Sequence, residues 1–220
     1  MTDLGHNPPF FDLVGDMRAM RRLKPDPVPL EQLQRVLEAG VKAPSGMNSQ
    51  PWSFLAIQDA DGKRWFADHY RAGIESRFGR LDVPEGDASP MARQLRALRY
   101  QVDHMQEFPL LLLVCGLRDW PFRVPEEERV GLAPPNYGAI YPCVQNILLA
   151  CRALGLGAAL TTMHQVFEEA LHERFGIPLE YGVVVTIPIG IPIGCFGPVR
   201  RKPAADVTYF GTWGNRDAPR

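Results

Sequence analysis

Two clusters of basic residues lie near opposite ends of a chain whose charge is otherwise balanced, with 24 Lys and Arg against 25 Asp and Glu. The clusters consist of Arg18, Arg21 and Arg22 near the start, and Arg200, Arg201 and Lys202 near the end. Guanidinium groups suit a phosphate dianion because their paired N–H donors match its oxygens. Spacing alone leaves two interpretations open with equal weight: a phosphate site, or two solvated patches on the surface.

A polar loop carries a second set of groups that could take part in chemistry. The segment from Ser45 to Pro51 reads SGMNSQP, so hydroxyl, amide and apolar side chains follow one another closely. An isoalloxazine ring needs hydrogen-bond donors and acceptors along its pyrimidine edge and apolar groups against its faces. The loop could supply both kinds of contact, although an ordinary connection between a helix and a strand explains its composition equally well.

Composition and missing motifs argue against several classes of function. A net charge of −1 gives no field that favours nucleic acid or an anionic membrane surface. The chain contains no GxGxxG, P-loop, HExxH or GxSxG pattern. Its cysteines lack the spacing of a disulfide framework or a zinc site. We therefore predict a cytoplasmic protein without a resident metal, a membrane span or a secretory signal.

Hydrophobic periodicity predicts the elements that position these groups. Apolar spacing of three and four residues indicates helices, whereas short runs rich in aliphatic side chains indicate strands. The predicted helices are 29–43, 63–79, 89–106, 140–154 and 166–175, and the predicted strands are 52–57, 110–115, 158–162 and 181–188. Helices and strands do not alternate strictly, so we predict an α+β fold, with residues 1–220 forming one domain. The proline-rich and acidic segment from Trp120 to Tyr137 is expected to be a long loop.

The helix predicted from Ile140 to Leu154 is apolar around nearly its whole circumference, with Pro142 assigned to its first turn. Such a helix must be buried, either inside the protomer or against a second subunit, and we favour a homodimer interface. The tail at 190–220 is rich in proline and glycine yet carries several aromatic residues. We expect this extended tail to pack on the partner protomer.

Four segments in the same order resemble the signatures of the nitroreductase family of FMN-dependent oxidoreductases. They read RAMRRLKPDPVP, APSGMNSQPWSF, GLGAALTT and RRKP, and together they run from Arg18 to Pro203. The PSGxNxQPW block is highly specific, and the RxxR segment is moderately so. The resemblance implies a central mixed or antiparallel sheet flanked by helices, in an intertwined homodimer that builds two FMN sites across its interface.

The same resemblance assigns cofactor-binding roles by motif position. It implies phosphate and ribityl contacts from Arg18, from either Arg22 or Arg21, and from Arg201, with Arg200 as a further cofactor-binding residue. Arg21 could also approach the pyrimidine edge of the ring. The family loop that lies against the flavin from the partner protomer matches Pro44, Ser45, Met47, Asn48 and Gln50. Backbone N–H groups of Thr161, Thr162 and Met163 are expected near flavin N5. One departure is Ala19, where many relatives have a serine hydroxyl for the phosphate.

The resemblance also implies the reaction: NADH or NADPH reduces FMN, and an electron-poor acceptor such as a nitroaromatic or a quinone then takes the electrons. No catalytic side chain is required because the flavin carries the chemistry. His164 follows Thr162 closely and could donate a proton, although a structural role is the favoured interpretation. Alternatives are reductive dehalogenation, enone reduction or oxygen-dependent flavin chemistry on the same fold, and a flavin-binding protein without turnover.

Overall fold

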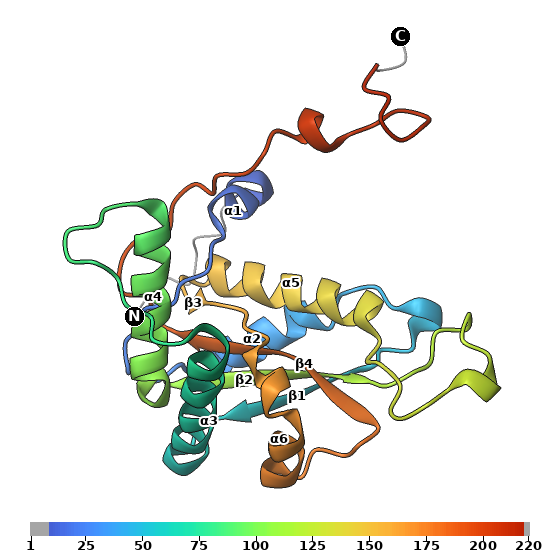
Figure 1. The fold of residues 1–220 in the computed structure, drawn as a ribbon, viewed down its shortest axis with the longest axis horizontal. Coiled ribbons are helices and arrows are strands. Elements are labelled where there is room, and N and C mark those ends of the chain that lie inside the picture. Colours follow the sequence, from blue (N-terminus) through green and yellow to red (C-terminus); the bar gives the residue numbers. More distant parts are fainter. Residues whose placement is uncertain (1–8, 218–220) are drawn as a thin grey trace.

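An antiparallel sheet lies at the centre of the protein, between two layers of helices (Figure 1). The computed structural model describes residues 9–217, and within them the sheet has four strands in the order β1-β2-β4-β3. The strands are β1 (Trp52–Ile57), β2 (Leu110–Leu117), β3 (Gly157–Ala158) and β4 (Tyr181–Gly190). The predicted α+β class with a mixed or antiparallel sheet is therefore confirmed, and every pairing is antiparallel.

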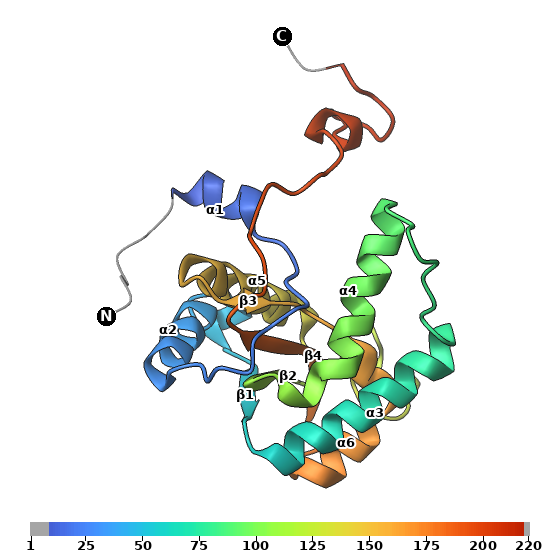
Figure 2. The same ribbon diagram turned by 90° about the vertical axis from the view of Figure 1, so that its left-hand side faces the viewer.

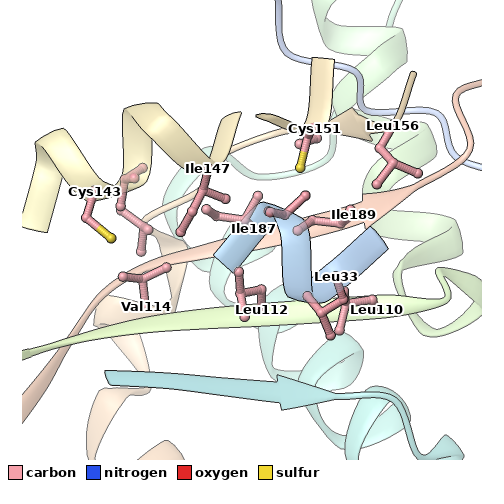
Figure 3. Packing of buried hydrophobic residues seen from close by; sticks show 14 of the residues in the cluster. Leu33, Leu110, Leu112, Val114, Cys143, Ile147, Cys151, Leu156, Ile187 and Ile189 are labelled. Carbon is pink, nitrogen blue, oxygen red and sulfur yellow. The ribbon is translucent and has the colours of Figure 1, made fainter. Parts of the chain in front are cut away.

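Strand β2 is buried on both faces because its side chains alternate between the two helical layers. Leu110, Leu112 and Val114 face a cluster covered by α2 (Leu30–Gly40) and α5 (Tyr137–Ala153). Figure 3 shows these side chains packed with Ile147 and Cys151 of α5 and with Ile187 and Ile189 of β4. The cysteines of α5 thus fill core space as small apolar residues.

The opposite face of the sheet carries the second layer, which contains α3 (Ala60–Phe78), α4 (Pro90–His104) and α6 (Glu168–Phe175). Leu111 and Leu113 of β2 pack there against Phe66 and Tyr70 of α3. Figure 2 shows α3 and α4 as the two long helices on this side, joined by a connection that extends away from the sheet.

Two predicted boundaries are wrong in an informative way. Helix α5 begins at Tyr137, where the side chain of Asn136 caps the Ala139 amide, so Pro142 lies inside the helix and not in its first turn. The strand predicted at 158–162 shrinks to Gly157–Ala158, because Thr161 makes only an isolated bridge to Thr186. A strand continues only as far as a neighbouring strand pairs with it, and local composition cannot show where that pairing ends.

The segment that carries the first basic cluster adds to the edge of the sheet. Leu23 pairs with Pro192, and the Met20 amide donates to the Ala158 carbonyl at 2.9 Å. Gly157 makes this approach possible, since a Cβ there would lie 2.7 Å from Leu23 Cδ2. The absence of a side chain at Gly157 therefore lets the segment that carries Arg18, Arg21 and Arg22 lie against the edge of the sheet.

The two ends of the described chain lie outside the layers. Helix α1 (Phe10–Asp16) contacts α5, and the Val199 amide donates to the Gly15 carbonyl at 2.9 Å. Beyond this point the chain leads away from the sheet, as both views show (Figures 1 and 2). Within residues 9–217 no helix is long and apolar enough to cross a membrane, and no group of His, Cys, Asp or Glu side chains could hold a metal ion.

We predict that Gly157→Ala lowers the free energy of unfolding by about 1–3 kcal/mol, because the new methyl group would force Leu23 and the adjacent segment outward. Urea denaturation measures this change. Gly138→Ala is the matched control, since a Cβ there meets nothing closer than 3.9 Å and alanine favours the helix. Equal stability of the two variants would contradict the tight approach at Gly157.

Candidate functional site

A cavity of about 230 Å³ opens where α3 and α4 meet the segment between β3 and α6. Helix α3 contributes Tyr70, Ile74 and Phe78, and helix α4 contributes Leu98 and Gln101. Arg21 and the run from Leu160 to Met163 complete the lining. The cavity thus joins one predicted arginine with the predicted Thr161, Thr162 and Met163, although these groups lie far apart in the sequence.

Gln101 is the polar group of this cavity that sequence reasoning missed. Its side chain is 1% exposed, and its Nε2 has no hydrogen-bond partner among the residues that the structure describes. Leaving such a donor unsatisfied costs about 1–3 kcal/mol, and Gln101 is the residue with such an atom that also lines this cavity within the described chain. The signal was present in the sequence, because Gln101 interrupts the apolar stripe of Leu98, Val102 and Met105.

The donors of the cavity fit one edge of a planar heterocycle. The Arg21 guanidinium and the Gln101 amide offer N–H groups to ring carbonyl or nitrogen atoms, and the amide carbonyl can accept from a ring N–H. Ile74, Leu98 and Leu160 supply apolar contact. A flavin has this combination of a polar pyrimidine edge and apolar faces, so the residues present fit that group.

Thr161 and Thr162, both predicted to offer backbone N–H groups near N5, differ in whether their amides are already used within the chain. The Thr161 amide donates to the Thr186 carbonyl at 2.9 Å, and the Thr186 amide returns a bond of 3.0 Å to the Thr161 carbonyl. The amide and the carbonyl of Thr161 are therefore both used by Thr186. No bond from the Thr162 amide is found within the described part of the chain, which makes Thr162 the better donor of the pair.

The two basic clusters come to the same side of the molecule. Arg18 lies beside the chain near Gly197, where an added Cβ would be 3.9 Å from its Nη1. Arg22 is exposed, with its guanidinium 5.8 Å from the centre of the Tyr100 ring. Arg200 and Arg201 are also exposed and follow the contact between Val199 and Gly15. Ala19 is exposed as well and offers only a methyl group.

The loop after α2 is held in a strained conformation. Met47, Asn48 and Gln50 have φ values of 52°, 56° and 47°, in the left-handed region that residues with a side chain rarely adopt. The Ser45 hydroxyl accepts from the Gln50 amide at 3.0 Å and closes the turn. Met47 is fully exposed. Strain of this kind is kept where a loop must be organised in advance for binding.

One chain does not bring this loop to the cavity. The loop leads into β1, an edge strand of the sheet, whereas Arg21 and Thr161 lie beside β3 and β4 at the other edge. None of the loop residues lines the cavity. Within one chain, the predicted site residues therefore form two separate halves.

His164 has the surroundings of a structural residue. It is fully buried, and its Nε2 lies 2.7 Å from the Val183 carbonyl, to which it donates in the neutral ring. Burial lowers the pKa of His164, while the bond to Val183 and the charge of Glu168 oppose that change. A neutral ring whose proton is used by Val183 is a poor proton donor for a ligand, which agrees with the interpretation favoured from the sequence.

Arg118 anchors the long loop that precedes α5. Its guanidinium donates to Glu168 Oε1 at 2.9 Å, to the Ala133 carbonyl at 3.0 Å and to the Tyr181 carbonyl at 3.2 Å. A second cavity of about 1120 Å³ lies beside this ion pair and α6. It contains none of the predicted cofactor residues, so we assign it no role in the site.

A sequence profile described as the nitroreductase family matches residues 16–191. The chain belongs to the nitroreductase family. It is 40% identical over 203 residues to an NADH dehydrogenase of Thermus thermophilus, covering 88% of this chain and 91% of the relative. It is also 29% identical over 186 residues to an iodotyrosine deiodinase of Thermotoga neapolitana, covering 83% and 88%.

Solved structures of the family agree with the fold. An iodotyrosine deiodinase bound to FMN and 3-iodo-L-tyrosine superimposes with a TM-score of 0.67 at 25% identity, covering 87% of this chain and 94% of that one. A nitroreductase from Desulfovibrio desulfuricans in complex with FMN gives 0.63 at 25% identity, covering 94% and 98%. The nitroreductase resemblance inferred from four short motifs is thus confirmed over most of the chain.

We predict that Met47→Gly is more stable than Met47→Val by about 1 kcal/mol or more, because glycine adopts the left-handed region freely and a β-branched residue resists it. Thermal and urea unfolding of the two variants give the difference. At an ordinary exposed position glycine has the higher conformational entropy cost and no such advantage. A valine variant at least as stable as the glycine variant would mean that Met47 is not held at positive φ.

Proposed function

We propose that this protein is an FMN-dependent oxidoreductase that transfers hydride from NADH or NADPH to a small electron-poor acceptor such as a nitroaromatic or a quinone. The observation that carries the proposal is the cavity in which Arg21 and the unsatisfied amide of Gln101 converge. Membership of a family with FMN-bound relatives supports the choice of cofactor. The name of the Thermus relative supports a nicotinamide electron donor.

The residues of this chain would hold FMN in three groups. Arg18, Arg22, Arg200 and Arg201 are the candidates for the phosphate, since charge-assisted bonds to guanidinium are the strong ones. Arg21 and Gln101 would bind the pyrimidine edge, and Thr161, Thr162 and Met163 would lie along the ring. The third group is the loop that carries Pro44, Ser45, Met47, Asn48 and Gln50, supplied by a second copy of the chain.

FMN supplies reversible two-electron transfer when it is bound, and the protein supplies position and electrostatics. The cationic Arg21 favours negative charge in the cavity, where burial strengthens its effect. Ile74, Phe78 and Leu98 would give apolar contact to the ring. None of these roles needs a side-chain nucleophile, because the cofactor carries the chemistry.

We propose a homodimer, because two copies of the chain could bring the separated halves of the site together. Helix α5 leaves Tyr137 and Tyr141 as an exposed stacked pair, 43% and 42% exposed, on a helix that is otherwise largely apolar. The tail beyond Pro203 also offers a surface for contact, because Trp213 is 88% exposed. Arg216 donates to the Ala205 and Asp206 carbonyls and so stabilises the turn of the tail. Both surfaces suit a second copy, as proposed for the tail at 190–220. The cytoplasmic location stays a prediction.

Reductive dehalogenation is the second candidate, and similarity to the deiodinase of Thermotoga neapolitana is the observation that favours it. The two reactions share the reduced cofactor and differ in the acceptor. Release of halide from a halogenated phenol by the reduced protein, without turnover of quinones, would favour the second candidate. A protein that binds FMN and transfers electrons to neither acceptor would instead be a flavin-binding protein.

The decisive experiment is the visible spectrum of the purified protein, followed by anaerobic addition of NADH or NADPH. We expect a yellow protein whose oxidised flavin band bleaches with one nucleotide and returns with the acceptor. A yellow protein that does not bleach would contradict the nicotinamide donor. A colourless protein that FMN cannot reconstitute would overturn the cofactor.

We predict that Arg201→Ala lowers FMN occupancy by about tenfold, because a charge-assisted phosphate contact is worth about 1.5–3 kcal/mol. Folding stability should change by less than about 0.5 kcal/mol, since Arg201 is exposed and bonds only its neighbour's carbonyl within the described chain. Flavin content per protein and urea denaturation measure the two effects. Arg64→Ala on α3, whose side chain is 67% exposed, is the control and should keep full occupancy.

A further inference from the structure

Tyr70 brings a buried hydroxyl to the cavity, and none of the roles described so far uses it. Its side chain is 1% exposed, and its ring stacks on Phe66 with centroids 6.1 Å apart. Tyr70 lines the cavity that also contains Arg21 and Gln101, and its hydroxyl lies 3.5 Å from the hydroxyl of Thr161, another lining residue. Packing alone would be satisfied by phenylalanine at this position, so the phenolic oxygen needs an explanation of its own.

The partner of this hydroxyl is Thr161, whose backbone cannot move freely. Reciprocal bonds to Thr186 hold its amide and carbonyl at the end of the sheet. Its side-chain oxygen accepts from the Met163 amide at 3.4 Å and donates to Tyr70 Oη at 3.5 Å. The Thr161 hydroxyl is therefore oriented by two neighbours, one of which is Tyr70.

This contact leaves one hydroxyl hydrogen unused. Tyr70 and Thr161 share a single hydrogen bond between their hydroxyl groups, so one of their two O–H hydrogens has no acceptor recorded among residues 9–217. Burial raises the pKa of Tyr70, and the bond from Thr161 and the positive charge of Arg21 oppose that rise only in part. The phenol consequently stays protonated at neutral pH, and it can donate to a group that enters the cavity.

We infer that Tyr70 is a positioning residue of the flavin site: it orients the Thr161 hydroxyl and presents a hydrogen-bond donor that favours the reduced form of the bound cofactor. The inference rests on the proposed function, since it concerns FMN in this cavity. Reduction adds negative charge to the ring, and a donor inside a buried site binds the more negative state better. Tyr70 therefore raises the midpoint potential of the bound FMN, in addition to raising the affinity for FMN.

Tyr70→Phe tests the inference because it removes only the hydroxyl and keeps the packed ring. The affinity for oxidised FMN should fall about threefold, in the range of one hydrogen bond. Binding of reduced FMN should fall about tenfold further, which lowers the two-electron midpoint potential by about 30 mV. Equilibrium titration of the apoprotein with FMN and spectroelectrochemistry of the loaded protein give the two values.

Tyr181→Phe is the matched control, since Tyr181 packs in the same hydrophobic cluster and its hydroxyl makes no recorded bond within the described chain. It should leave the affinity and the potential unchanged. Thr161→Val should lower the potential in the same direction, whereas Thr161→Ser keeps the hydroxyl and should retain the wild-type value. Tyr70→Phe combined with Thr161→Val should be less than additive, because the two hydroxyls act as one unit.

The outcomes separate the inference from the function on which it rests. Wild-type protein that binds no FMN would overturn both. A wild-type protein that binds FMN, together with a Tyr70→Phe variant of unchanged potential, would overturn the positioning role alone. Full additivity with Thr161→Val would show that Tyr70 does not act through Thr161. If Tyr70→Phe does not fold, a potential unchanged by Thr161→Val would overturn the inference.

Discussion

The pairing of β2 with β4 is the interaction on which the other parts of the structure depend. Each strand is buried on both faces, and the ladder between them satisfies backbone groups that would otherwise be costly inside the protein. Two segments at the cavity edge are held by β4 or by the chain that follows it. Thr186 fixes Thr161, and Pro192 pairs with Leu23, so the arginines and the threonines keep a constant separation.

A consequence of this arrangement is a site divided between the two edges of one sheet. The cavity lies beside β4 and β3, whereas the strained loop enters β1 at the far edge. Strands β2 and β4 lie between the two edges of the described sheet. The homodimer proposed above would bring the halves together, because each protomer would offer its loop to the cavity of the other.

Some of the groups proposed to bind FMN are left unsatisfied or strained in the isolated chain. Gln101 Nε2 has no partner among the described residues, the hydroxyl pair of Tyr70 and Thr161 keeps one unused hydrogen, and Met47 keeps a positive φ. Buried atoms away from the cavity, such as Arg152 Nε and Thr186 Oγ1, also lack a partner in the described chain. Unpaired polar atoms therefore do not distinguish the candidate site by themselves, and what distinguishes it is their convergence with Arg21 and Thr161 in one cavity.

Periodicity and motif order are local properties, so they can be read from the sequence alone. They gave the α+β class, the limits of β1, the positions of the main helices and membership of the nitroreductase family. The folded structure was needed to show where the predicted strand ends after Ala158, which of the Thr161 and Thr162 amides is free, and that Gln101 and Tyr70 belong to the cavity. These facts depend on the register of β4 and on helices that meet across the chain. Contacts between distant residues leave no regular spacing in the sequence, so they become visible only once the chain is folded.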